Sequence, residues 1–350
     1  MKKMPVAFLL GLALSAVTAE AQDAATPPLP KPAPGFVQPK TPWGDPDIQG
    51  FWPGVEMVGV PLQRPARFGQ RNVLTEEEFN QRAKDIKTEE DSLLAEIDVF
   101  TADVTTPCAI RCPTSPTPHW QETGKPSHQA SLIVDPLDGR QPPLSPEGQA
   151  RQAQQQADAR ARTARLQGRE ADTYLDRSLY DRCITRGVMG SLLPTIYNNG
   201  NEIVQGPGWV ALRNEMIHET RIVPLDSRPR ISSEIRSFMG DSRGHWEGNT
   251  LVVETTNFND RTSGISVNGG GNRHSEAMKV TEHITRVSPD LLIWRMTFDD
   301  PKTWTRPFTV ELPLRRDDNY GMFEYACHEG NYAMFNILSG ARADEKAAKK

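Results

Sequence analysis

Residues 240–253 read Gly240-Asp241-Ser242-Arg243-Gly244-His245-Trp246-Glu247-Gly248-Asn249-Thr250-Leu251-Val252-Val253. Two strand-like runs in this stretch flank the dipeptide Gly248-Asn249. Glycine and asparagine tolerate the positive φ angles that a two-residue hairpin turn requires. The stretch therefore predicts a β-hairpin, and short strands with tight turns are expected to continue on both sides of it.

The chain around this hairpin is predicted to form sequential strands that no helix separates. We expect strands at residues 202–205, 209–217, 219–223, 244–247, 251–257, 277–287, 291–299, 304–314 and 322–327. Strands joined by short turns form an antiparallel meander, and about eight of them close most simply into an up-and-down barrel. The predicted fold is therefore mainly β, as a lipocalin-like barrel or a strongly curled sheet. A two-sheet β-sandwich is the alternative.

The chain starts with a predicted signal peptide, residues 1–21. Lys2 and Lys3 form a basic start, an apolar run covers residues 6–17, and small residues precede a cleavage point after Ala21. The apolar run is shorter than the roughly 20 residues that span a bilayer, and no later segment is apolar enough to do so. We expect the mature protein to have no transmembrane segment and to be periplasmic or secreted.

Four further parts are expected after the signal peptide. They are a proline-rich extended arm at 22–70, a helical and loop region at 71–200, the barrel at 201–338 and a flexible tail at 339–350. One helix is predicted to start at Thr75, because Glu78 completes a capping box. A second is predicted to start at Ser145, because Pro146 follows this cap residue. Both helices are expected at the periphery of the barrel.

Export permits disulfide bonds, and the number of cysteines, four, is even. Of the three possible connectivities we favour Cys108–Cys112 together with Cys183–Cys327. The spacing of Cys108 and Cys112 also loosely resembles that of zinc ligands, but no second pair with nearby histidines follows it. Disulfides are therefore the preferred interpretation, and no residue is assigned as a metal ligand.

The formal net charge of the chain is −5 at pH 7. Lysine and arginine residues are interspersed with acids, whereas binding of phosphates requires clustered basic side chains. The charge pattern argues against a nucleic-acid partner, so a small molecule is the expected ligand. The oligomeric state is not predicted.

Distinctive motifs occur along the mature chain. They are GDSRGHWEGNTLVVETTNF at 240–258, DIQGFW at 47–52, residues 135–143, DRC at 181–183, HSEA at 274–277 and CHEGNY at 327–332. Together these motifs resemble the hallmarks of a large family of secreted proteins from environmental bacteria. The resemblance covers nearly the whole mature chain, and it implies a shared architecture and no particular mechanism.

The first candidates for catalysis are His274 and Glu276. Residues two apart on a strand share a face, so this imidazole and this carboxylate would both point into the barrel mouth. A carboxylate raises the basicity of an imidazole and fixes its tautomer. We therefore predict His274 as a general base and Glu276 as the residue that orients it. A hydrogen-bonded surface pair is the alternative.

Asp241 and His245 form a second predicted catalytic set, and Arg221 is expected to help position the substrate. Trp246 is assigned to substrate binding, because an indole on the lumen side of a barrel can stack on a ring. The alternatives are structural salt bridges for the charged residues and a core position for Trp246.

Two His-Glu dipeptides occur, at 218–219 and 328–329. Neighbours on a strand point to opposite faces, so neither dipeptide can present both side chains on one side. His328 and Glu329 are nevertheless assigned to substrate binding. If His245, His274 and His328 converged at one end of the barrel, they would favour a functional site and would suit a divalent metal. No cofactor is assigned.

These predictions describe an exported enzyme that uses acid/base chemistry, hydrolytic or eliminative, on a small carbohydrate-like or phenolic molecule in the barrel mouth. It would be a hydrolase or a lyase. One alternative is a non-catalytic protein that holds an apolar ligand inside the barrel. Another is a structural, envelope-associated module.

Overall fold

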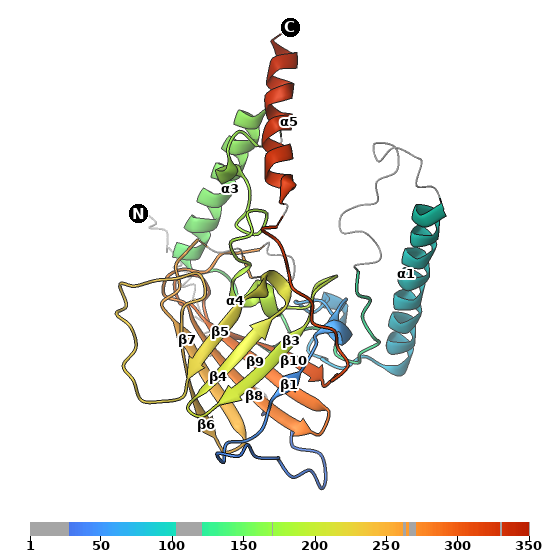
Figure 1. The fold of residues 1–350 in the computed structure, drawn as a ribbon, viewed down its shortest axis with the longest axis vertical. Coiled ribbons are helices and arrows are strands. Elements are labelled where there is room, and N and C mark those ends of the chain that lie inside the picture. The colour runs from blue at the N-terminus through green and yellow to red at the C-terminus, as the bar shows by residue number, and fades with distance from the viewer. Residues whose placement is uncertain are drawn as a thin grey trace, which may run out of the picture.

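The computed structural model describes residues 28–102, 121–169, 171–261, 264–265, 271–329 and 331–349, without the side chains of 96–102 and 189. Strands in these residues form two antiparallel sheets, one with six strands and one with four. The six-stranded sheet has the order β2-β10-β9-β8-β7-β6, and the four-stranded sheet has the order β1-β3-β4-β5 (Figure 1). Neither sheet closes into a barrel.

The strands are β1 (Gly50–Phe51), β2 (Ile133–Asp135), β3 (Asn201–Gly206), β4 (Trp209–Asn214), β5 (Thr220–Pro224), β6 (Asp241–Glu247), β7 (Thr250–Thr256), β8 (Lys279–Ser288), β9 (Leu291–Asp299) and β10 (Phe308–Arg315). The α-helices of the described residues are α1 (Glu76–Ala102), α3 (Pro146–Leu166), α4 (Gly187–Leu192) and α5 (Tyr332–Ala348). The 3₁₀ turns in the same residues are η1 (Val55–Met57), η2 (Ala66–Phe68), η4 (Tyr174–Asp176) and η5 (Met216–His218).

The predicted barrel is wrong because the meander is interrupted and its edges are covered. β5 and β6 belong to different sheets, and no strand forms in residues 225–240 between them. β1 pairs with the outer edge of β3, and β2 pairs with the outer edge of β10. Segments that precede the meander therefore occupy the edges that barrel closure would have joined. The two-sheet alternative is closer to the structure.

The central hairpin forms as predicted. β6 and β7 pair in antiparallel register, with Glu247 opposite Thr250, and Gly248 in the turn has a φ of +59°. One prediction near the C-terminus is wrong, because the expected strand at 322–327 is an irregular segment. Residues 339–348 of the expected flexible tail are helical and belong to α5.

Both predicted helix starts are confirmed. Thr75 N donates to Glu78 Oε2 (2.8 Å) while Glu78 N donates to Thr75 Oγ1 (3.3 Å), which is a capping box. Ser145 Oγ accepts from Gly148 N (3.0 Å), and Pro146 follows the cap. The helix that begins there, α3, projects from the body beside α5, as Figure 1 shows.

The described part of the proline-rich arm packs on the body. Arg295 Nη2 on β9 donates to Pro28 O (3.0 Å), and Ala33 N donates to Val287 O on β8 (2.7 Å). Further along, Trp52 is fully buried in the core. Trp52 therefore has a packing role in the core, whereas Trp43 is exposed.

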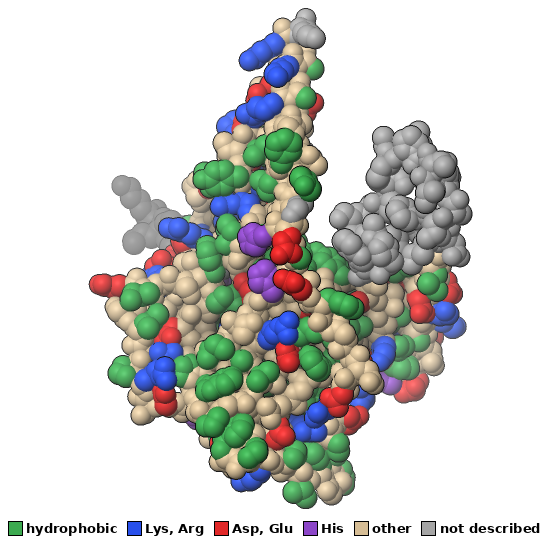
Figure 2. Space-filling model, in the orientation of Figure 1, with side chains coloured by type: hydrophobic (Ala, Val, Ile, Leu, Met, Phe, Trp, Pro, Cys, Tyr) green, Lys and Arg blue, Asp and Glu red, His purple; other side chains and the backbone are tan. Residues whose placement is uncertain are grey.

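The outer face of the four-stranded sheet carries exposed apolar side chains on β3, β4 and β5. They are Val204, Trp209 and Ile222. Figure 2 shows hydrophobic side chains scattered over this side of the molecule. Among the described helices, none has both the length and the apolar character that crossing a bilayer requires.

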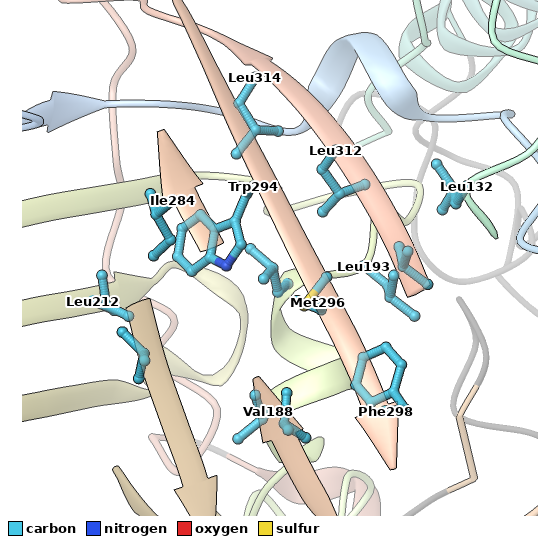
Figure 3. Close-up of a cluster of buried hydrophobic side chains, with 14 of the residues drawn as sticks. Leu132, Val188, Leu193, Leu212, Ile284, Trp294, Met296, Phe298, Leu312 and Leu314 are labelled. Atoms are coloured by element: carbon cyan, nitrogen blue, oxygen red, sulfur yellow. The ribbon is translucent and has the colours of Figure 1, made fainter. Parts of the chain in front are cut away.

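The two sheets share one hydrophobic core. Both contribute side chains that point into the space between them, as Figure 3 shows for Leu212, Ile284, Trp294, Met296 and Leu312. Alternate residues of each strand supply this layer, as the period of two requires. The space between the sheets is therefore filled by side chains.

One ion pair is buried in this core. Arg221 on β5 donates from Nη1 to Glu282 Oε2 (2.6 Å) and from Nη2 to Glu282 Oε1 (2.8 Å) across the two sheets. Trp294 Nε1 also donates to Glu282 Oε1 (2.9 Å). The side chains of Arg221 and Glu282 are 5% and 0% exposed. A bidentate, charge-assisted contact of this kind fixes the position of one sheet against the other.

Replacement of Arg221 by alanine is expected to lower the free energy of unfolding by about 3–5 kcal/mol, because Glu282 would remain buried without a counter-ion. Urea unfolding followed by tryptophan fluorescence measures this loss. The matched control is Arg213→Ala, which removes the partly exposed pair with Glu202 and should cost less than about 1 kcal/mol. Equal losses in the two variants would contradict the structural role of the buried pair.

Candidate functional site

The predicted catalytic pair His274 and Glu276 is not brought together. Both residues lie in the loop before β8, which begins only at Lys279, so strand alternation does not apply to them. His274 is 5% exposed, and its ring packs edge-on against Phe258. Glu276 points outward and pairs with Arg236 (3.2 Å). Burial also lowers the pKa of the His274 imidazole.

Ser275, which lies between them, holds this loop in place. Ser275 N and Oγ donate to the two carboxylate oxygens of the buried Asp300, at 2.6 and 2.7 Å. Thr303 Oγ1 donates to the same carboxylate (2.5 Å). These bonds attach the HSEA motif to the end of β9, which is a structural role.

The predicted residues on β5 and β6 are held by structural contacts. Asp241 pairs with Arg243 (2.6 Å), and His245 Nε2 lies 3.1 Å from Glu247 Oε1 on the exposed outer face of β6. Trp246 packs against the core from the opposite face. Arg221 forms the buried pair described above. His245 and Glu247 therefore share a face, as strand alternation predicts.

The three histidines whose convergence would favour a functional site lie in different settings. His245 is exposed on β6, His274 is buried in a loop, and His328 lies in the irregular segment that precedes α5. In the residues that the structure describes, no group of three or more histidine, cysteine or acidic side chains is placed to hold a metal ion. The condition for a metal site at these histidines is therefore not met there.

A different group of chemically capable residues gathers where the C-terminal strap, residues 316–329, crosses the body. We use the name junction for this strap together with Glu122 and residues 180–200 and 214–219. The predicted disulfide Cys183–Cys327 is present and joins two parts of the junction. In Figure 1 the strap runs from β10 past α4 to α5. Cys108 and Cys112 lie outside the described residues.

The disulfide is consistent with an extracytoplasmic location, because such bonds persist in oxidising compartments.

The backbone of the junction is unusually strained. Of the six non-glycine residues with positive φ in the described chain, four lie in it: Cys183, Asn198, Ile217 and His218. The φ of 60° at Ile217 is a true outlier, because branching at Cβ disfavours this region. Strain of this kind persists only where surrounding contacts impose it, and it is common at functional sites.

His218 has an oriented and exposed imidazole. Its Nδ1 lies 2.8 Å from the backbone oxygen of Tyr325 on the strap. A carbonyl oxygen only accepts, so Nδ1 carries the proton and a neutral ring has its lone pair on Nε2. No described residue contacts Nε2 by a hydrogen bond. The ring of His328, also exposed, lies 6.3 Å away between centroids.

A pair of histidine side chains lies beside acidic side chains at the base of the projecting helices, as Figure 2 shows.

Three phenol groups form a cluster within the junction. The Tyr180 hydroxyl contacts the hydroxyls of Tyr197 and of Tyr325, the latter at 2.8 Å, and Arg186 lies over the Tyr180 ring. Burial raises the pKa of Tyr180 and raises that of Tyr325 to about 12. Tyr180 and Tyr325 therefore stay neutral at physiological pH and act as hydrogen-bonding groups rather than as bases.

Three carboxylates complete the junction, of which Glu215 is buried and Glu219 and Glu122 are half-buried. Glu219 accepts hydrogen bonds from the hydroxyls of Thr185 and Ser191, and burial raises its pKa. Glu122 and Glu215 both contact the hydroxyl of Tyr320. An exposed base beside hydroxyl donors and partly buried acids is an arrangement that can move protons.

Strand alternation failed to identify His218 because the predicted strand at 209–217 ends at Asn214. The chain then turns through η5, so His218 and Glu219 are not strand neighbours and alternation does not govern them. The repetition of a His-Glu dipeptide, one copy directly after Cys327, was the available signal.

Comparison of the chain with protein-family models, with curated proteins and with solved structures found no match.

Proposed function

We propose that the protein is an extracytoplasmic enzyme that performs acid/base chemistry, hydrolytic or eliminative, at the junction. The observation that carries the proposal is the hydrogen bond from His218 Nδ1 to Tyr325 O, at 2.8 Å. It directs the basic nitrogen, Nε2, away from the protein on an exposed ring. Fixing the tautomer of an accessible imidazole through a backbone carbonyl is how general bases are commonly prepared.

In this mechanism His218 Nε2 removes a proton from water or from a hydroxyl group of the substrate. The imidazolium that forms keeps its Nδ1–H bond to Tyr325 O, and this bond strengthens when the ring becomes charged. His328, whose ring is a near neighbour, binds the substrate together with Glu329, the role that the sequence assigns to both. The proposed mechanism uses neither His274, which is buried, nor Glu276, which pairs with Arg236.

The proposed substrate is a small carbohydrate-like or phenolic molecule. The hydroxyls of Tyr180, Tyr197 and Tyr325 can each donate and accept a hydrogen bond, so they match hydroxyl groups better than charged ones. Phe323 and Tyr332 expose most of their surface on either side of His328 in the sequence, and aromatic rings stack on sugars and phenols.

The main alternative is weakened by the fold. An apolar ligand inside a barrel requires a lumen, whereas the space between the two sheets holds side chains such as Trp294 and Met296. No observation favours a structural envelope module over the enzyme.

Replacement of His218 by asparagine tests the base. Asparagine tolerates positive φ and can donate to Tyr325 O from its amide, but it lacks Nε2. Wild type is first assayed on a panel of nitrophenyl glycosides and nitrophenyl esters. On any substrate that is turned over, His218→Asn should lower kcat by about 10²–10⁴-fold.

The matched control is His245→Asn, which changes another exposed histidine that contacts an acid. It should leave kcat unchanged. A large loss in the control with full activity in His218→Asn would refute the assignment. Binding of panel members without any turnover would favour a binding protein.

Removal of the disulfide tests the dependence of the site on the strap. Cys183→Ser combined with Cys327→Ser should lower the free energy of unfolding by about 2–5 kcal/mol. Turnover should also fall in the folded variant, because His328 follows Cys327 directly and would no longer be held beside His218. Undiminished turnover by the folded double variant would contradict this role of the strap.

A further inference from the structure

Two carboxylates meet one phenol hydroxyl in the junction. Tyr320 Oη lies 3.0 Å from Glu122 Oε1 and 2.7 Å from Glu215 Oε2. The three residues come from separate parts of the chain: Glu122 precedes β2, Glu215 follows β4, and Tyr320 lies on the strap. Both distances are within hydrogen-bonding range, so each contact requires a proton.

The remaining contacts of the carboxylates come from neutral amides. Glu215 accepts from Gly200 N through Oε2 and from Phe323 N through Oε1, each at 3.1 Å. Glu122 Oε2 accepts from Asn199 N (3.2 Å) and from the Asn199 side-chain amide. No lysine or arginine among the described residues pairs with either carboxylate, so the titratable groups that face each other here are Glu122, Glu215 and Tyr320.

Counting protons decides the ionisation state. A phenol has one proton and can donate to only one of the two carboxylates. The other contact must then be made by a proton on a carboxyl group. Both oxygens of Glu215 accept backbone N–H groups, whereas Glu122 Oε1 has Tyr320 as its hydrogen-bond partner. The extra proton therefore belongs on Glu122 Oε1.

We infer that Glu122 is a neutral acid at neutral pH, that it donates to Tyr320, and that Tyr320 donates to an ionised Glu215. This chain of hydrogen bonds fastens the strap to the body, because Phe323 N and the Tyr320 hydroxyl are both strap groups bound to Glu215. Loss of the proton from Glu122 places two negative charges on either side of one hydroxyl. The attachment of the strap therefore weakens as pH rises. This inference does not depend on the proposed function.

Burial supports the same assignment. It raises the pKa of the Glu122 carboxyl, and the nearby charge of Glu215 acts in the same direction. The native state then holds a proton that the unfolded chain releases above the ordinary pKa of a glutamic acid. Stability from this group is complete below that pKa and is lost as pH rises through the raised pKa of the native state.

The two glutamates should respond oppositely to replacement by glutamine. Glu122→Gln reproduces a neutral acid, since its amide donates to Tyr320 and its oxygen accepts from Asn199. Glu215→Gln places an amide donor against Gly200 N or Phe323 N, both of which are donors, and so breaks the attachment. Glu202→Gln, in the surface pair with Arg213, is the matched control.

The experiment measures hydrogen exchange at the Phe323 amide, corrected for its intrinsic rate, between pH 5 and pH 9. In wild type and in Glu202→Gln the protection factor should fall by about tenfold or more across this range, since one unit of pKa shift is a factor of ten. In Glu122→Gln it should stay within about twofold, and in Glu215→Gln it should be low throughout.

A second measurement follows the titration of the Glu122 carboxyl directly. Carbon-13 NMR of labelled glutamate side chains should show one carboxyl, absent in Glu122→Gln, that titrates above the ordinary range. The inference is overturned if Glu122 titrates at an ordinary glutamic acid pKa. It is also overturned if the protection of Phe323 in wild type does not change with pH.

Discussion

The disulfide between Cys183 and Cys327 joins segments separated by 144 residues, and the arrangement of the C-terminal strap depends on it. The strap has no regular secondary structure, so side chains of the body must satisfy its backbone groups. His218 does so at Tyr325 O, and Glu215 does so at Phe323 N. The residues that give the junction its chemistry are thus the same residues that hold the strap in place.

Local features of the fold follow from the sequence, whereas the arrangement of the strands in two open sheets does not. The Gly248-Asn249 turn and the caps at Thr75 and Ser145 involve neighbouring residues, and all three form as predicted. β1 has two residues and β2 has three, too few for an alternating pattern to show. Their pairing with β3 and β10 is determined by tertiary contacts. It leaves two separate sheets in place of a closed barrel.

The same distinction explains the candidate site. A period of two holds inside strands, which is why His245 and Glu247 share a face of β6. It fails for His274 and for His218, which lie in a loop and in a 3₁₀ turn. The turn depends on a positive φ at Ile217. Isoleucine disfavours this backbone conformation, so its propensity does not predict the turn. Contacts elsewhere in the fold impose the conformation.

The acids of the core and of the junction have different neighbours. Between the sheets, Glu282 faces the guanidinium of Arg221, which supplies the opposite charge. In the junction, Glu122 has only neutral donors and another carboxylate as neighbours, and burial raises the pKa of both Glu122 and Glu219. The acid of the core therefore faces a counter-ion, whereas Glu122 in the junction does not. The region in which burial raises the pKa of acids is thus also the region that presents an accessible imidazole.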